Sequence, residues 1–200
     1  MATLLLLRHG QSVWNFENRF TGSADVDLSL LGIEEAKKSG FLLKKYNIDI
    51  AFTSMLKRSV HTLEIILEII GKNIPVFKSA ALNERNYGDL QGLNKTETEK
   101  KYSILQVLLW RRSFKIAPPN GESLKNTYDR VTQYYQSEIV PQLRNNKNVL
   151  IVAHGNSLRA LIMYLEDISE TAISDFEIET GVIRMYSFDN KFKINHISQS

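Results

Sequence analysis

The sequence contains no cysteine and only four histidines among its 200 residues. Disulfide bonds, thiol catalysis and cysteine-ligated zinc are therefore excluded, and a cytoplasmic location is favoured because disulfides mark oxidising compartments. A metal site would have to use histidine and carboxylate ligands, and no two of these histidines have the spacing of metal ligands on one helix. We therefore expect a cytoplasmic protein without a metal cofactor.

Long apolar runs are also missing. The four leucines at positions 4–7 end at Arg8, and they are too few for the apolar region of about 7 to 15 residues in a signal peptide or for a membrane span of about 20. Lys and Arg number 25, Asp and Glu 22, and the net charge of +3 is spread along the chain. We expect no nucleic-acid or membrane partner and a small anionic substrate. The length fits one domain, residues 1–200.

Strand-like and helix-like apolar patterns alternate along the chain. Strands are predicted at residues 3–7, 48–53, 75–82 and 148–153, with a closing hairpin of 181–188 and 192–197. Helices are predicted at residues 29–46, 57–70, 94–114, 123–144 and 158–165, and Gly71 is expected to end the second of them. This order predicts an α/β fold with three layers, α/β/α, around a central, mostly parallel sheet. Such folds bind ligands beyond the carboxyl ends of the strands.

One short pattern occurs twice, as LLLLRHGQSV and as LIVAHGNSL. Each copy places a histidine, His9 or His154, directly after a buried strand, so both imidazoles are expected at the same edge of the sheet. A neutral imidazole is a nucleophile towards phosphorus, and a nearby arginine such as Arg8 would stabilise a transferring phosphoryl group. Gly10 is expected to let backbone N–H groups approach the phosphate. Taken singly, either histidine is better explained as the cap of a strand–helix turn, but the pair favours phosphoryl transfer.

Further motifs extend this pattern over nearly the whole chain. In order, they are RHGQSVWN (8–15), NRFTG (18–22), DVDLSLLG (25–32), TSMLKRSVHT (53–62), LNERNYGDLQGLNK (82–95), WRRSF (110–114), PPNGES (118–123) and AHGNSLRAL (153–161). The ordered set resembles the cofactor-dependent phosphoglycerate mutases of the histidine phosphatase superfamily. The resemblance implies a phosphoglycerate mutase-like fold and a homodimer. It also implies interconversion of 3-phosphoglycerate and 2-phosphoglycerate, a step of glycolysis and gluconeogenesis, with 2,3-bisphosphoglycerate as primer and intermediate and no metal.

The resemblance also implies residue roles. His9 would be the phosphorylated nucleophile, with Arg8, Arg58 and His154 around the transferred group. Glu84 would accept and return the proton of the substrate hydroxyl; without the resemblance it would be interpreted as the ion-pair partner of a neighbouring arginine. Contacts to substrate and primer are expected from Asn15, Thr21, Gly22, Arg85, Tyr87, Lys95, Arg111, Arg112, Gly155 and Asn156.

Three functions are compatible with these residues. The first is the mutase, the second is a phosphatase of the same superfamily in which water accepts the phosphoryl group, and the third is an inactive scaffold that binds phosphorylated ligands. Lys95 and the adjacent Arg111 and Arg112 favour the mutase, because a phosphoglycerate carries a carboxylate as well as a phosphate and guanidinium groups bind both bidentately. Intact His9 and Glu84 argue against the scaffold.

The sequence departs from the family pattern at the edges of the expected site. Asn86 stands where a histidine is common, and Ser23 and Ala24 stand where larger aromatic residues are common. The segment after Phe114 and the tail after Phe192 are short. Because such segments help to exclude water from the site, we expect a low bisphosphoglycerate phosphatase side activity.

Overall fold

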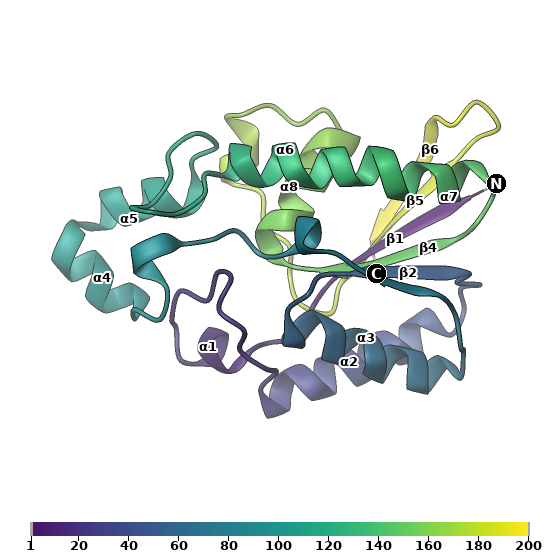
Figure 1. Cartoon of the computed structure of the whole chain (residues 1–200), viewed down its shortest axis with the longest axis horizontal. Coiled ribbons are helices and arrows are strands. Elements are labelled where there is room, and N and C mark those ends of the chain that lie inside the picture. The colour runs from purple at the N-terminus through teal and green to yellow at the C-terminus, as the bar shows by residue number, and fades with distance from the viewer. Residues whose placement is uncertain (1, 200) are drawn as a thin grey trace.

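Six strands form one mixed sheet in the computed structural model, which describes residues 2–199 (Figure 1). The strands are β1 (Thr3–Arg8), β2 (Ile50–Thr53), β3 (Val76–Lys78), β4 (Val149–Ala153), β5 (Ile183–Phe188) and β6 (Ile194–Gln199). Their order is β3-β2-β4-β1-β5-β6, with parallel pairing from β3 to β1 and with β5 antiparallel to both of its neighbours. The predicted α/β fold with a mostly parallel sheet and a closing hairpin is confirmed.

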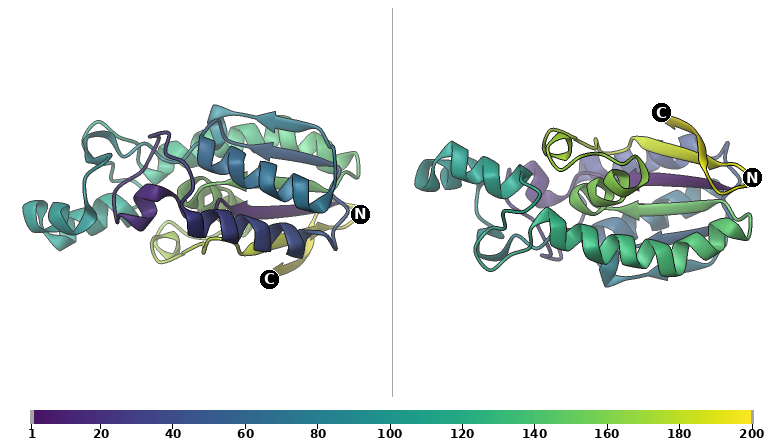
Figure 2. Two further views of the ribbon diagram at one scale, coloured as in Figure 1. Left: turned by 90° about the horizontal axis from the view of Figure 1, so that it is seen from below. Right: turned by 90° about the horizontal axis from the view of Figure 1, so that it is seen from above.

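Helices cover both faces of the sheet and give the three predicted layers. They are α1 (Val13–Phe16), α2 (Leu30–Leu43), α3 (Lys57–Ile70), α4 (Lys95–Tyr102), α5 (Ile104–Arg112), α6 (Leu124–Tyr134), α7 (Val140–Arg144) and α8 (Gly155–Leu165). The pair α2 and α3 packs on one face and the pair α6 and α8 on the other, as the two views of Figure 2 show. None of the helices within residues 2–199 is long and apolar enough to cross a membrane.

Strand β1 shows why both faces need a helical cover. Leu4 and Leu6 belong to the apolar cluster under α6 and α8, whereas Leu5 and Leu7 belong to the cluster under α2 and α3. All four side chains are at most 2% exposed. Since successive side chains of a strand point to opposite faces, a continuous apolar run is the pattern of a strand buried on both sides.

Two predicted elements are shorter than expected. Of residues 75–82, only the three residues of β3 form a strand, which pairs with β2. Ala80–Leu82 form a 3₁₀ turn, and the Ala81 N–H donates a hydrogen bond to the Ser79 hydroxyl. The predicted helix 94–114 is divided into α4 and α5 at Ser103, which has a positive φ of 76° and caps α5 by accepting a hydrogen bond from the Gln106 N–H. The apolar periodicity continued across this break and concealed it.

Other helix boundaries also differ from the prediction. The helix predicted at 123–144 contains a π-helical turn, Tyr135–Ile139, between α6 and α7. Helix α8 begins at Gly155, directly after His154, rather than at residue 158, and the short helix α1 was not predicted. By contrast, α3 ends as expected at Gly71, whose left-handed φ of 65° suits a glycine.

Helices α4 and α5 extend beyond the carboxyl ends of the parallel strands, away from the sheet (Figure 1). A separate apolar cluster of Phe20, Leu90, Val107 and Trp110 packs this extension against the rest of the chain. The extension therefore carries the residues at the end of α5 to the edge of the sheet where the histidine-bearing strands end.

Candidate active site

A pocket with a volume of about 280 Å³ lies beyond the carboxyl ends of β1 and β4. Most of the predicted site residues line it, namely Arg8, His9, Asn15, Thr21, Gly22, Arg58, Glu84, Tyr87, Lys95, Arg111, Arg112, Gly155 and Asn156. The edge of the sheet thus gathers segments that are far apart in the sequence, as expected for a parallel α/β fold. Two other predicted residues, His154 and Arg85, are fully buried and do not line the pocket.

His9 follows β1 and is held in one orientation. Its Nδ1 lies 2.6 Å from the Gly10 carbonyl oxygen, which can only accept, so Nδ1 carries the proton and Nε2 the lone pair. The Arg58 Nε donates to that Nε2 at 3.3 Å. Burial, and then the charges of Arg58 and Arg8, hold the pKa of His9 well below its ordinary value. The imidazole is therefore neutral at neutral pH, which is the nucleophilic form.

His154 lies beside His9 on the neighbouring parallel strand. The ring centroids are 4.9 Å apart with the planes at 62°, because β1 and β4 pair in register with Arg8 opposite Ala153. The His154 Nε2 is 2.7 Å from the Ser54 hydroxyl, whereas its buried Nδ1 has no hydrogen-bond partner among the described residues. Burial, and then Arg58, lower the pKa of His154 well below its ordinary value. The two histidines are brought together as predicted.

Two arginines frame the histidine pair. The Arg58 side chain is 1% exposed and donates from Nη2 to the Gly22 carbonyl at 2.7 Å and from Nη1 to the Ala24 carbonyl at 2.8 Å, so its orientation is fixed. The Arg8 Nη1 donates to the Ile178 carbonyl at 2.7 Å. Burial lowers the pKa of Arg58 to about 10, although the charges of Glu84 and Asp25 oppose this shift, so Arg58 stays protonated at neutral pH.

The expected role of Gly10 is corrected. Its N–H donates to the Thr62 hydroxyl at 3.2 Å and is not directed at a ligand. A Cβ at Gly10 would lie 2.2 Å from the Gly32 carbonyl oxygen, and a Cβ at Gly32 would lie 2.0 Å from the Gln11 carbonyl oxygen. Glycine is needed here because the loop after β1 and the first turn of α2 have their backbones in contact.

Glu84 lines the pocket from the loop that follows β3. Its Oε1 accepts hydrogen bonds from the Arg85 N–H at 2.7 Å and from the Asn156 N–H, in the first turn of α8, at 3.1 Å. The amino end of a helix stabilises a carboxylate. The side chain is therefore fixed between its own loop and the helix that follows His154.

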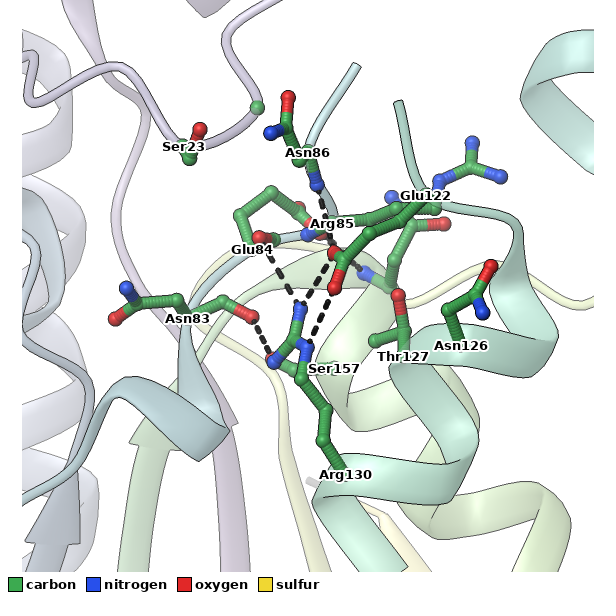
Figure 3. Close-up of polar contacts among 12 residues, drawn as sticks. Ser23, Asn83, Glu84, Arg85, Asn86, Glu122, Asn126, Thr127, Arg130 and Ser157 are labelled. Carbon is green, nitrogen blue, oxygen red and sulfur yellow. Dashed lines mark hydrogen bonds and ion pairs between the residues drawn. The ribbon is translucent and has the colours of Figure 1, made fainter. Parts of the chain in front are cut away.

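An Arg130–Glu122 pair holds the loop of Glu84 from behind (Figure 3). Arg130 Nη1 donates to the Ala81 carbonyl at 2.7 Å and to the Asn83 carbonyl at 2.9 Å, and Nη2 donates to the Glu84 carbonyl at 3.3 Å. Its Nε and Nη2 also donate to the two Glu122 carboxylate oxygens, each at 3.0 Å. Glu122 in turn accepts from the Asn86 N–H at 2.9 Å. Sequence reasoning missed this pair, although both residues lie in or near predicted motifs.

The end of the pocket away from the histidines is rich in cations. Lys95, Arg111 and Arg112 line it together, and burial followed by the charge of Arg111 lowers the pKa of Lys95. Burial, and then Arg111, also lower the pKa of Arg112. Cations this close to each other favour a bound anion that neutralises them.

Arg85 lies behind the pocket wall and does not line the pocket, so its contact with substrate stays a prediction. It is fully buried, its Nη2 donates to the Tyr87 hydroxyl at 2.9 Å and to the Arg111 carbonyl at 3.0 Å, and its guanidinium carbon is 4.5 Å from the Tyr87 ring centroid. Burial alone would raise the pKa of Tyr87, but the charge of Arg85 and the hydrogen bonds from Arg85 and Asn156 together outweigh it, and the pKa is lowered. Arg85 therefore orients Tyr87, which does line the pocket.

Five further residues line the pocket and were not predicted, namely Arg19, Phe20, Arg159, Glu177 and Ile178. Arg19 and Phe20 lie within the motif NRFTG and Arg159 within AHGNSLRAL, so their motifs could have indicated them. Glu177 and Ile178 lie in no motif, and only the folded chain brings them to the pocket.

Comparison with known proteins agrees with this geometry. The chain matches the histidine phosphatase superfamily (branch 1) over residues 4–197. It is 54% identical over 198 residues to a 2,3-bisphosphoglycerate-dependent phosphoglycerate mutase of Cytophaga hutchinsonii, covering 99% of this chain and 93% of that protein. It is 54% identical over 193 residues to a phosphoglycerate mutase of Schizosaccharomyces pombe, covering 95% and 92%.

Solved structures share this fold. The α-ribazole phosphatase of Shigella flexneri superposes with a TM-score of 0.84 at 25% identity, covering 99% of this chain and 96% of that one. The family match and the identities over nearly the full length confirm the resemblance seen in the motifs. The chain belongs to branch 1 of the histidine phosphatase superfamily and, within it, to the 2,3-bisphosphoglycerate-dependent phosphoglycerate mutases.

Proposed function

We propose that this protein interconverts 3-phosphoglycerate and 2-phosphoglycerate through a phosphorylated His9. The observation that carries the proposal is one pocket with two differently built ends. One end has His9 with Arg8 and Arg58, and the other has the cations Lys95, Arg111 and Arg112. A phosphoglycerate carries a phosphate and a carboxylate, and these two anionic groups fit the two groups of cations. Full-length relatives at 54% identity bear the name of this activity.

The second cationic end also fits the primer, because 2,3-bisphosphoglycerate carries two phosphates and a carboxylate. The primer supplies the phosphoryl group that first phosphorylates His9. We assign the bond to Nε2, since Nδ1 donates to the Gly10 carbonyl and is not available. Arg8 and Arg58 neutralise charge that develops on the phosphoryl oxygens, and the buried His154 Nδ1, which has no hydrogen-bond partner among the described residues, would donate to one of them.

Glu84 carries the proton in both half-reactions of the proposed mechanism. When the hydroxyl of 3-phosphoglycerate attacks phosphorus, the carboxylate takes its proton, the P–N bond to His9 breaks and a P–O bond forms. In the reverse sense, His9 takes the other phosphoryl group, the carboxyl returns the proton to the leaving oxygen, and 2-phosphoglycerate results. The fixed position of Glu84 between Arg85 and Asn156 supports this role, because proton transfer requires a positioned carboxyl group.

A phosphatase of the same superfamily is the second candidate function. The likeness to the solved α-ribazole phosphatase of Shigella flexneri favours it, since the two folds superpose over nearly their whole lengths. In that case water, and not a hydroxyl of the substrate, would accept the phosphoryl group of His9. The cations at the far end of the pocket favour the mutase, because they would hold the bisphosphorylated intermediate while it reorients.

An enolase-coupled assay tests the proposal. Conversion of 3-phosphoglycerate is measured with and without added 2,3-bisphosphoglycerate, in the wild-type protein and in His9→Ala. We expect turnover that is stimulated by the primer and abolished by the substitution. Turnover that ignores the primer, or survives loss of His9, would overturn the mechanism; release of inorganic phosphate faster than isomerisation would favour the phosphatase.

A further inference from the structure

The segment between α8 and β5 contains residues 171–181, which we call the strap (Figure 2, yellow-green). Part of the strap lines the pocket. Ile173 is fully buried, and its carbonyl accepts a hydrogen bond from Arg159. Further along, the Thr180 hydroxyl donates to the Glu35 carboxylate at 2.9 Å. The strap is therefore fixed near both ends, and its middle, Glu177 and Ile178, lines the pocket.

The strap places two oxygen acceptors on two pocket arginines. The Ile178 carbonyl accepts from Arg8 at 2.7 Å, and the Glu177 carboxylate pairs with the Arg112 guanidinium. The Arg112 side chain is 26% exposed and that of Glu177 is 66% exposed, so the pair lies at the mouth of the pocket with the carboxylate facing solvent. The negative charge of Glu177 thus pairs with Arg112, which an anionic ligand in the pocket would contact.

Two neighbouring ion pairs show that this placement is specific to Glu177. Glu99 lies 3.8 Å from Arg111, and Glu170, just before the strap, lies 2.7 Å from Lys115. Neither Glu99 nor Glu170 lines the pocket. Among the described residues, Glu84 and Glu177 are the acidic residues that line the pocket.

We propose that Glu177 is a specificity-determining residue that competes with the anionic end of the substrate for Arg112. A ligand whose carboxylate or second phosphate reaches Arg112 must displace the Glu177 carboxylate, and the strap then loses its contact with α5. The inference rests on the proposed function, since it takes a phosphoglycerate as the ligand. It predicts that the pocket binds a phosphoglycerate more weakly than its cations would without Glu177.

The competition acts on one end of the pocket. The charges that act on His9 are those of Arg58 and Arg8, whereas the strongest on Arg112 is that of Arg111. Glu177 should therefore affect ligands long enough to reach both ends. Inorganic phosphate, which is small enough to bind beside His9 alone, should be affected little.

Glu177→Gln tests the inference, because it keeps the shape of the side chain and removes the charge. We expect the KM for 3-phosphoglycerate to fall by about two- to fivefold, the range expected for a partly exposed ion pair of this kind. The inhibition constant of inorganic phosphate should stay within about 1.5-fold of wild type, and raising the ionic strength should shrink the difference in KM. Glu170→Gln is the matched control, and its KM should equal that of the wild type.

Two outcomes overturn the inference. If Glu177 only fastens the strap, Glu177→Gln raises the KM or leaves it unchanged. If it acts through the general charge of the protein, Glu170→Gln lowers the KM as well. Failure of the proposed function is recognised separately, by a wild type that shows no primer-dependent isomerisation. Calorimetric binding of 3-phosphoglycerate to His9→Ala, with and without Glu177→Gln, measures the competition without turnover; equal dissociation constants would contradict it.

Discussion

Arg130 gives the sharpest test of how the chain positions Glu84. The perturbation is Arg130→Lys, which keeps the positive charge. The Arg130 guanidinium makes five hydrogen bonds, three to backbone carbonyls of residues 81, 83 and 84 and two to Glu122. The ammonium group of lysine has three N–H donors in place of five, and it lacks the planar guanidinium group that donates to several acceptors at once. At least two of these hydrogen bonds are therefore lost.

The magnitude follows from the kind of bond lost. A hydrogen bond between neutral groups contributes about 1 kcal/mol to stability and one to a charged group about 1.5–3 kcal/mol. Every bond of the Arg130 fork involves the charged guanidinium, so loss of two should lower the free energy of unfolding by about 3–6 kcal/mol. Because the loop that carries Glu84 loses its fixed position, kcat should fall by about tenfold to hundredfold.

Urea unfolding followed by circular dichroism measures the first effect, and the enolase-coupled assay at a temperature where the variant is folded measures the second. Lys125→Met is the matched control on the same helix, because Lys125 forms an exposed pair with Asp129 at 2.7 Å. That substitution should change stability by about 0.5 kcal/mol or less. A stable, fully active Arg130→Lys would refute the reasoning, and an unstable variant with normal kcat would show that Arg130 supports the fold without positioning Glu84.

Three further predictions concern the histidine end of the pocket. Burial holds the pKa of His9 and His154 well below 6.5 in the folded protein, whereas in the unfolded chain both titrate at about 6.5. Below that pH the unfolded state therefore binds more protons than the folded state. Stability is lost as the pH falls through this region, by about 1.4 kcal/mol per pH unit for each histidine. The slope of unfolding free energy against pH between 7 and 5.5 should be smaller in His9→Gln, and an unchanged slope would show that His9 is not kept neutral. Ser54→Ala removes the partner of His154 Nε2 at 2.7 Å and should lower kcat by about tenfold, with partial rescue by Ser54→Thr; unchanged kcat in Ser54→Ala would mean that the hydroxyl does not orient the ring. Gly10→Ala would place a Cβ 2.2 Å from the Gly32 carbonyl oxygen and should destabilise the protein by about 2 kcal/mol or more in thermal unfolding; a wild-type melting temperature would contradict the close packing of the two backbones.

The parts of the site that depend on local pattern could be predicted from the sequence. A continuous apolar run predicts a strand buried on both faces, and two such runs that each end in a histidine place His9 and His154 at one edge of a parallel sheet. The structure has them 4.9 Å apart. Gly71 ended α3 as its sequence predicted, because a left-handed residue after an apolar helix favours glycine. These features follow from periodicity and single-residue preferences, which are properties of short segments.

The ordered motifs also predicted most of the residues that line the pocket, but not the direction of every side chain. Arg85 and Tyr87 lie in the same motif, yet Tyr87 lines the pocket and Arg85 is buried behind it. Because Arg85 and Tyr87 are so close in sequence, the motif predicts the same role for both. They differ in the direction in which their side chains point. That direction depends on the Arg111 carbonyl, which accepts from Arg85 and belongs to a helix 26 positions away.

The packing of the folded chain determines which distant residues act on the site. The Arg130–Glu122 pair holds the loop of Glu84 across a gap of 46 positions between Arg130 and Glu84, and Glu177 meets Arg112 from 65 positions away. Each of these residues alone resembles an ordinary surface charge in the sequence. A charged side chain acquires a role from what faces it, and what faces it is set by the packing of whole helices and strands against each other. The strand that ends before His9 could be identified from a short run of consecutive residues. The residues that position Glu84 or compete for Arg112 could not be identified in this way.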